Sequence, residues 1–272
     1  FGFGIAAGVN IIGNTVLAAI EDSTLYATGS ASVRATEEAT IMGFAIGGAG
    51  SQKSAIAGSI GINAIVNGID AHVKNSTLRM GGAIEITAED RATLVSLAGA
   101  VAVSTGDKGV GVAIGWNRVS DSVTAYADKA SLTSTAGGVS VLAKSNSLLV
   151  GITAAGGGGT ATSGAGALMI NSIANSIDAH INNDSSVNAG GNVSVIASEA
   201  ASLYSAALAV GVSTSGGAIG AVISYNFVGA VDNMADPNLI TIADAPASSD
   251  AEGSKNISVK DASTADAASV TA

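Results

Sequence analysis

The two histidines of this chain stand in matching tetrapeptides, the pattern in the sequence that comes closest to a reactive site. The tetrapeptides are Ile69-Asp70-Ala71-His72 and Ile177-Asp178-Ala179-His180. In a strand, residues two positions apart point to the same face, so each Asp–His pair could bind a metal ion or exchange protons. Whether the two pairs can act together depends on the elements that carry them.

Those elements belong to a repeat of about 54 residues. One asparagine marks each copy, with spacings of 53, 54, 54 and 55 residues; the five are Asn10, Asn63, Asn117, Asn171 and Asn226. Aliphatic pairs keep the same phase, as in Ile84/Ile86, Val139/Val141, Val193/Val195 and, in the last repeat, Ile257/Val259. The sequence therefore predicts a single repeat array over residues 1–272, with repeats at about 1–54, 55–109, 110–163, 164–217 and 218–272.

The repeat weakens the metal hypothesis. His72 and His180 are two repeats apart, which means at least about 9.5 Å even at one layer per repeat. Zinc-bound histidine nitrogens lie about 2.0 to 2.1 Å from one metal, so the two cannot share an ion. We expect both pairs on a solvated outer strand face.

The marker asparagines invite two interpretations, surface binding residues or an internal ladder. Their regular return favours a ladder in which side-chain amides hydrogen-bond from layer to layer. Four residues further on, a second polar column holds Asn14, Asn67, Asp121 and Asn175 before Ala230 breaks it. We interpret these positions as corners with Asx turns.

Composition favours a narrow β interior. The chain has 36 glycines, 3% aromatic residues and no cysteine. Small and β-branched residues cannot fill a wide core, but they can line a thin one in which successive layers stack about 4.8 Å apart. The formal charge of -10 makes nucleic acid and anionic lipid poor partners, because phosphate binding needs clustered Lys and Arg.

Within a repeat, alternation with period two predicts strands, as in 83–88, and no apolar stripe of helical period appears. Three strands of about five residues with short corners need about 25 residues, which predicts two coils per repeat. The alternative is a stacked hairpin, because 94–103 and 110–116 flank the turn-like segment 104–109. Both are repetitive all-β arrays, and the first is a β-solenoid.

The last repeat departs from the others. About nine residues are inserted within 234–253, which contains both prolines, Pro237 and Pro246, and several acids. Insertions in solenoids become surface loops, sometimes on a binding face, although a loop without a partner is the simpler interpretation. The chain opens without Met and in the middle of a unit, so we expect it to be a piece of a longer array.

Other function classes find little support. The run 156–159 is followed by Thr160 and lacks the Gly-Lys-Ser/Thr of a phosphate loop, and calcium-binding nonapeptides are missing. The sequence assigns no catalytic, cofactor-binding or metal-binding residue, and we expect no enzyme activity, no cofactor and no small-molecule substrate. Residues 145–177 carry no charge, but their Gly and Asn argue against a spanning helix. An outer-membrane β-barrel stays an alternative without its expected aromatic girdles.

The units Ala-x-Ala-Gly-Ser-x-x-x-Asn-x-Ile-x-Asn, Val/Ile-x-Ala-x-Ile/Val and Ala-Gly-Gly-Asn-Val-x-Val are clearest in 55–73 and 164–195. They resemble the repeats of very large bacterial surface proteins of the filamentous-haemagglutinin and leukotoxin-type filamentous adhesin group. The resemblance covers 1–231 and implies a right-handed parallel β-helix, export to the bacterial cell surface and an adhesive role. It carries over no binding residue.

The leading hypothesis is therefore a structural segment of an extracellular adhesin or surface fibre, a rigid stalk. The expected partners are neighbouring repeats or further copies of the chain, and a ligand on a host or neighbouring cell. The alternative from a second class is a filament subunit whose open ends pair between chains.

Overall fold

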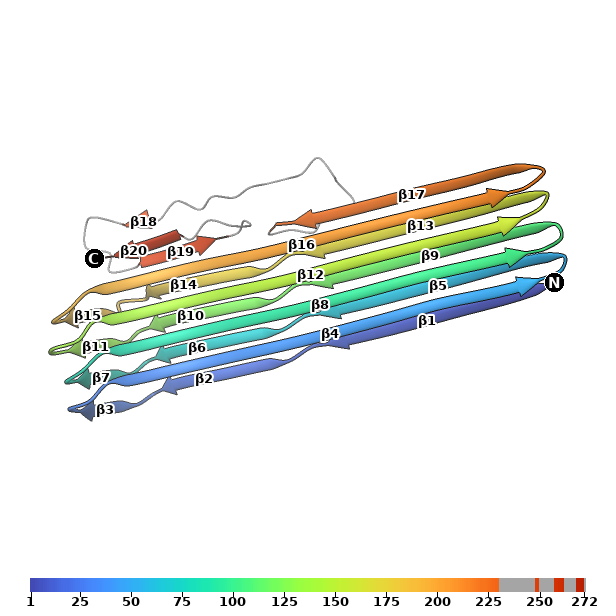
Figure 1. Ribbon diagram of the computed structural model, residues 1–272. Helices are drawn as coiled ribbons and strands as arrows, with labels where there is room; N and C mark the ends of the chain where they lie inside the picture. Colours follow the sequence, from blue (N-terminus) through green and yellow to red (C-terminus); the bar gives the residue numbers. More distant parts are fainter. Residues whose placement is uncertain (230–247, 250–256, 262–267, 272) are drawn as a thin grey trace.

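The structure, a computed structural model, describes residues 1–229, 248–249, 257–261 and 268–271. Over these residues the chain is all-β, and successive strands stack into parallel sheets (Figure 1). Each coil is a long, flat loop in which three strands run out and one long strand returns. The chain is thus a parallel β-solenoid, which confirms the predicted fold class.

Each coil consists of four strands, and equivalent strands of successive coils form one sheet each. The strands of 11 or 12 residues are β1 (Gly2–Ile12), β5 (Ser54–Ile65), β9 (Lys108–Val119), β13 (Thr162–Ile173) and β17 (Gly217–Val228). The seven-residue strands are β2 (Thr15–Glu21), β6 (Gly68–Lys74), β10 (Ser122–Asp128) and β14 (Ser176–Asn182). The four-residue strands are β3 (Thr24–Ala27), β7 (Thr77–Met80), β11 (Ser131–Ser134) and β15 (Ser186–Ala189). The 21-residue return strands are β4 (Ala31–Ser51), β8 (Ile84–Ser104), β12 (Val139–Gly159) and β16 (Val193–Ser213).

One repeat makes one coil, so the prediction of two coils per repeat was wrong. The marker asparagines pair directly, Asn63 with Asn117 and Asn117 with Asn171, one repeat apart. The estimate failed because it assumed strands of about five residues. A return strand instead runs for 21 residues, from Ile84 to Ser104, before the chain turns.

The stacked-hairpin alternative is wrong as well. β8 and β9 flank the predicted turn, but they belong to different sheets. β8 pairs with β4 and β12, and β9 pairs with β5 and β13. The turn at 105–107 is therefore the tip of a coil, where the chain passes from one sheet to the sheet facing it.

The interior changes character along the coil. Near β2, β3 and the first part of β4, the core combines alanine with Ile, Val and Leu, including the fully buried Ile69, Leu78 and Ile86. Near the tips, between the sheets of β5 and β8, the buried cluster contains only alanine: Ala55, Ala57, Ala100, Ala102, Ala113, Ala155, Ala165 and Ala167. The two sheets can therefore approach each other closely near the tips.

Inward glycines complete this close approach. A Cβ added at Gly111 would overlap the carbonyl oxygen of Gly156, and one added at Gly157 would overlap that of Gly164. Each pair joins the two facing sheets, so backbone lies against backbone there. Only glycine leaves room for such contact.

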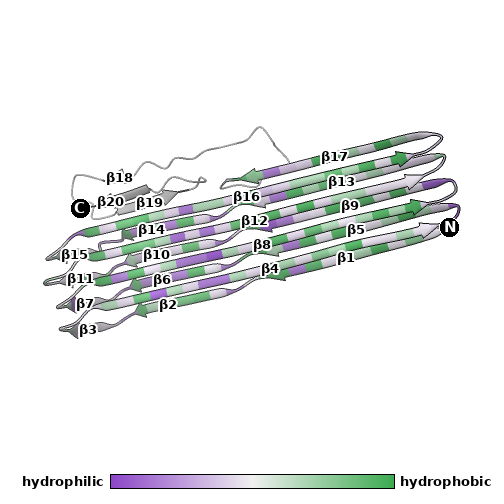
Figure 2. Ribbon diagram, viewed as in Figure 1, coloured by the Kyte–Doolittle hydropathy of each residue, from purple (hydrophilic) through white to green (hydrophobic). Residues whose placement is uncertain are grey.

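The charges follow the same division. We call residues 1–11, 39–64, 92–117, 147–171 and 201–226 the apolar half, and the rest of 1–229 the charged half. The only charged side chains in the apolar half are Lys53, Asp107 and Lys108, all at the tips. Figure 2 shows the most hydrophilic strand segments, in purple, outside the apolar half or at its tips and border.

The fifth repeat does not complete its coil. β17 continues the parallel stack on β13, but β19 (Ile257–Asp261) pairs antiparallel with β14, and β20 (Ala268–Thr271) pairs antiparallel with β16. The phase predicted for Ile257 and Val259 was therefore wrong, because Val259 lies opposite Ala179 rather than Val195. The insertion changes the spacing, so the residues that follow it no longer align with the equivalent positions of the preceding coil. β18 (Ser248–Ser249) pairs with β19, and the rest of the predicted loop 234–253 and Ala230 lie outside the described residues.

Candidate functional site

The marker asparagines form a continuous ladder inside the solenoid, as predicted. Each Nδ2 donates to Oδ1 of the next asparagine, at 2.8 Å from Asn10 to Asn63, 2.9 Å to Asn117, 2.8 Å to Asn171 and 2.8 Å to Asn226. Asn63, Asn117 and Asn171 are at most 1% exposed. Because the amides satisfy one another between coils, the ladder fixes the alignment of the stack.

A row of alternating glycine and serine faces this ladder from the return strands. The row runs Gly43, Ser96, Gly151 and Ser205. Ser96 Oγ accepts from Asn63 Nδ2 at 3.0 Å, and Ser205 Oγ accepts from Asn171 Nδ2 at 3.1 Å. A Cβ at Gly151 would lie 2.5 Å from Asn171 Oδ1, so the amide needs that space.

The second polar column joins coils through the backbone. Asn67 Oδ1 accepts from the backbone N–H of Asn14 at 3.0 Å, Asp121 Oδ1 from that of Asn67 at 2.6 Å, and Asn175 Oδ1 from that of Asp121 at 2.9 Å. These positions lie at the corner between the first two strands of each coil, as predicted. The side chains bond to the neighbouring coil, however, and not within an Asx turn of their own.

Opposite this column the return strands place a row of acids that sequence reasoning missed. Three of its four positions are acids, Glu37, Asp90 and Glu199, and the remaining one, between Asp90 and Glu199, is Ser145. Asn14 Nδ2 donates to Glu37 Oε1 at 2.8 Å, and Asn175 Nδ2 donates to Glu199 Oε1 at 3.1 Å. In the third coil the residue types differ at both positions. The corner column carries an acid, Asp121, in place of asparagine, and the return strand carries Ser145 in place of an acid.

The exchange brings two carboxyl groups together inside the protein. Asp90 is 0% exposed and Asp121 2% exposed. Burial raises the pKa of Asp90 to about 8, with the charge of Asp121 adding to the shift, and burial raises the pKa of Asp121 to about 6. Asp90 Oδ1 and Asp121 Oδ2 are buried without a hydrogen-bond partner, so a proton shared between the two carboxyl groups would satisfy both oxygens. Such pairs serve acid–base catalysts, but this one is closed to solvent and no substrate can reach it.

The histidines lie in a second polar cluster, on the outer face of the β6–β10–β14 sheet. Tyr126 stands between them, with ring centroids 4.7 Å from His72 and 5.1 Å from His180. The structure thus separates the histidines by one full layer, and they cannot share an ion. The prediction that the histidines lie on an outer face was correct. The prediction that this face is solvated was wrong for His72, whose side chain is only 6% exposed in the stack.

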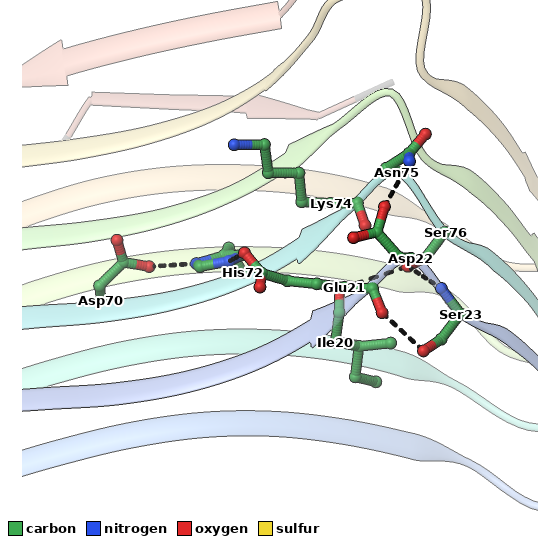
Figure 3. Close-up of polar contacts among 9 residues, drawn as sticks. All are labelled: Ile20, Glu21, Asp22, Ser23, Asp70, His72, Lys74, Asn75 and Ser76. Atoms are coloured by element: carbon green, nitrogen blue, oxygen red, sulfur yellow. Dashed lines mark hydrogen bonds and ion pairs between the residues drawn. The ribbon is translucent and has the colours of Figure 1, made fainter.

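Both ring nitrogens of His72 are occupied by carboxylates (Figure 3). Nδ1 lies 2.6 Å from Asp70 Oδ1, and Nε2 lies 3.0 Å from Glu21 Oε1, one coil away. Burial lowers the pKa of His72, but the hydrogen bonds with Asp70 and Glu21 outweigh it and raise the pKa above 6.5. His180 Nδ1 lies 3.1 Å from Asp178 Oδ1. Each Asp–His pair lies within one strand, whereas Glu21 links β2 to His72 on β6, and no nitrogen of His72 is left free for a metal.

The corner beside this cluster holds a third column, also missed. Asp22, Asn75 and Lys129 adopt positive φ angles of 47°, 48° and 50° at equivalent turns. Asn75 Nδ2 donates to Asp22 Oδ1, and Ser76 Oγ accepts from the backbone N–H of Ser23 at 3.0 Å (Figure 3). The Asp and Asn types at a spacing of 53 residues were the available signal, because these residues tolerate the left-handed conformation.

Within the part of the chain that the structure describes, no group of three or more His, Asp or Glu side chains is placed to hold a metal ion. No helix that could cross a membrane occurs among these residues either. The polar columns bond from coil to coil, and the carboxyl pair Asp90 and Asp121 is enclosed within the protein.

Comparisons with protein-family models, with curated proteins and with solved structures find no match to this chain.

Proposed function

We propose that the chain is a structural segment of an extracellular bacterial adhesin or surface fibre, a scaffold rather than a catalyst. The observation that supports this most is the continuity of the asparagine ladder through five repeats, Asn10 to Asn226. Each coil bonds to the next through its backbone and its polar columns, so a coil can be added without building a new core. The resemblance of the repeats supplies the bacterial surface and the adhesive role.

One coil per repeat changes the dimensions of such a scaffold. A repeat of about 54 residues adds only about 4.8 Å along the stack, while a 21-residue return strand extends over about 70 Å. Five repeats therefore form a plate that is broader than it is long. A stalk requires many repeats in tandem, and its cross-section is a wide, stiff ribbon.

A display series tests the stalk. Arrays with increasing numbers of the repeat 55–109 would be inserted between an outer-surface anchor and an epitope tag, and the height of the tag above the cell would be measured by super-resolution microscopy. We expect the height to rise in proportion to repeat number, by about 5 Å per repeat. A height that does not change with repeat number would contradict the proposal.

A filament subunit is the second candidate, and the open first coil favours it. Among the described strands, β1, β2, β3 and β4 each pair on one side only, so their free edges can accept another chain. β19 and β20 already occupy part of the opposite edge, on β14 and β16. Fibres whose length grows with protein concentration would favour this candidate over the stalk.

A further inference from the structure

The apolar half reverses the usual distribution of apolar side chains between interior and surface. Apart from Met169 and from Ile41, Leu94 and Leu149 at its border, its interior contains small side chains and the asparagine ladder, whereas its outer surfaces carry large apolar side chains. Phe44 and Ile46 are 64% exposed on the return strands, and Val112 is 42% exposed on the opposite sheet. Contiguous exposed apolar surfaces mark interaction sites, so another apolar surface is expected to cover this one.

The face formed by β1, β5, β9, β13 and β17 is the better defined of the two; we call it the β5 face. Four successive outward rows, those that begin at Phe3, Ile5, Ala7 and Val9, contain only glycine, alanine, aliphatic and aromatic residues. An apolar hollow lies among Val110, Val112 and Ile219, with Gly164 and Gly166 along its floor. The face thus offers both protruding side chains and a recess that accepts them.

The size of the β5 face suits a protein partner. Five strands at about 4.8 Å and seven residues at about 3.3 Å give a plan area of about 24 by 23 Å. This is close to the largest apolar patch of an ordinary monomer, about 300 to 600 Å², and it approaches the roughly 800 Å² that each partner contributes to a standard interface. Additional coils would enlarge it in proportion.

Charge indicates how two copies would align. The tips carry two lysines, Lys53 and Lys108, and one acid, Asp107, whereas acids outnumber bases in the charged half of residues 1–229. Two copies related by a two-fold axis through the β5 face would overlap only over their apolar halves. Each tip would then reach the acidic side of the other copy, and the two charged halves would point in opposite directions.

Lipid is the less suitable cover. Among the described strands, β1 and β17 each pair on one side only, so their outer edges present unpaired N–H and C=O groups. In hydrocarbon such groups cost several kcal/mol each, whereas water or a facing protein surface leaves them solvated. Contact between two copies covers the apolar face and leaves the edges of β1 and β17 exposed to water.

We propose that a second copy of this chain packs on the β5 face, apolar half against apolar half, with the tip of each copy beside the charged half of the other. The arrangement goes beyond the proposed scaffold, because it joins arrays side by side and not end to end.

The single tryptophan, Trp116, lies on the β5 face and reports its burial. Sedimentation equilibrium of the whole chain, over a concentration series without lipid, is expected to show a monomer–dimer equilibrium. Trp116 emission is expected to shift to shorter wavelength, with weaker acrylamide quenching, as the dimer forms. A chain that stays monomeric throughout, or that shifts its emission only when phosphatidylcholine vesicles are added, would overturn the proposal.

Matched variants locate the interface. Ile60→Lys with Val112→Lys places four like charges at the centre of the dimer, and we expect the dissociation constant to rise about a hundredfold. Ile152→Lys, on the opposite face of the same half and 40% exposed, is the control and should leave it unchanged. Circular dichroism and the monomer's Trp116 emission verify folding. Equal loss in both variants, or loss in the control alone, would show that the β5 face is not the contact.

If the double variant does not fold, Lys108→Glu serves in its place, with Lys129→Glu, far from the tip, as its control.

Discussion

Replacing Asp121 by asparagine is expected to stabilise the protein at neutral and alkaline pH and to reduce the pH dependence of its stability. Asparagine is the residue that the other coils carry at this position, at 14, 67 and 175. Its Oδ1 can still accept from the backbone N–H of Asn67, now 2.6 Å from Asp121 Oδ1. Its Nδ2 can donate to Asp90, whose Oδ1 has no other donor within the protein when both acids are ionised.

The magnitude follows from the shared proton. The pKa of Asp90 is raised by burial to about 8, and that of Asp121 to about 6, from an ordinary value near 3.8. Between about pH 4 and 8 the folded state therefore binds more protons than the unfolded state, so the free energy of unfolding falls as pH rises. One extra proton corresponds to about 1.4 kcal/mol per pH unit, or about 4 kcal/mol between pH 5 and 8.

Urea unfolding at pH 5, 6, 7 and 8 measures this dependence in the wild type, in Asp121→Asn and in Asp107→Asn, a control at the exposed tip. We expect the wild type and the control to lose about 4 kcal/mol over this range and Asp121→Asn to lose less, because the new Nδ2 donates to ionised Asp90 and the Asp121 charge is gone, although burial still raises the pKa of Asp90. An unchanged slope in Asp121→Asn, or a variant less stable than the wild type at pH 8, would refute the shared proton.

Three further perturbations test the polar columns. Asn117→Ala removes a buried rung, so Asn63 Nδ2 loses one acceptor and Asn171 Oδ1 loses its donor, and we expect a loss of about 2 to 4 kcal/mol in the free energy of unfolding. Gly151→Ala places a Cβ 2.5 Å from Asn171 Oδ1 and should lower the melting temperature, whereas Gly166→Ala, whose Cβ meets nothing closer than 4.0 Å, should not. An NMR pH titration should give His72 a pKa above 6.5, so that its contribution to stability is present below that pH and is lost as pH rises through the folded pKa; Glu21→Gln should lower this pKa, and no change would contradict the contact.

The stacking of the repeats could be predicted from the sequence because it depends on residues that recur at a fixed spacing. The asparagine at 10, 63, 117, 171 and 226 marks the alignment, and only an interior ladder gives each amide a partner at every copy. The number of coils per repeat depends on where the chain turns. Three consecutive charged residues, Glu89, Asp90 and Arg91, interrupt the apolar alternation in the middle of the return strand, so the sequence alone does not show that one strand of 21 residues continues through them.

The buried acid pair could not be predicted for a related reason. Asp90 and Asp121 are distant in sequence, and they meet only because the return strand of one coil faces the corner of the next. A prediction of two coils per repeat places the facing rows in different layers. The stacking of Tyr126 between the histidines was not predicted for a similar reason. Tyr126 occupies the position of the repeat that is histidine in the neighbouring coils, but it is a different residue type. The apolar outer faces were visible as alternation, but alternation alone does not say which set of residues points inward.

The most direct test of the fold is a disulfide between equivalent positions of successive repeats, which the absence of native cysteine makes simple to interpret. Ser140 and Ser194 are paired directly in neighbouring coils. With one coil per repeat their Cα atoms lie about 4.8 Å apart, within the range that a disulfide spans, whereas two coils per repeat would separate them by about 9.6 Å. Ser140→Cys with Ser194→Cys is expected to oxidise rapidly to an intramolecular disulfide, and the out-of-register pair Ser140→Cys with Ser198→Cys is not. Failure of the first pair to form a bond, or equal rates for both pairs, would contradict one coil per repeat.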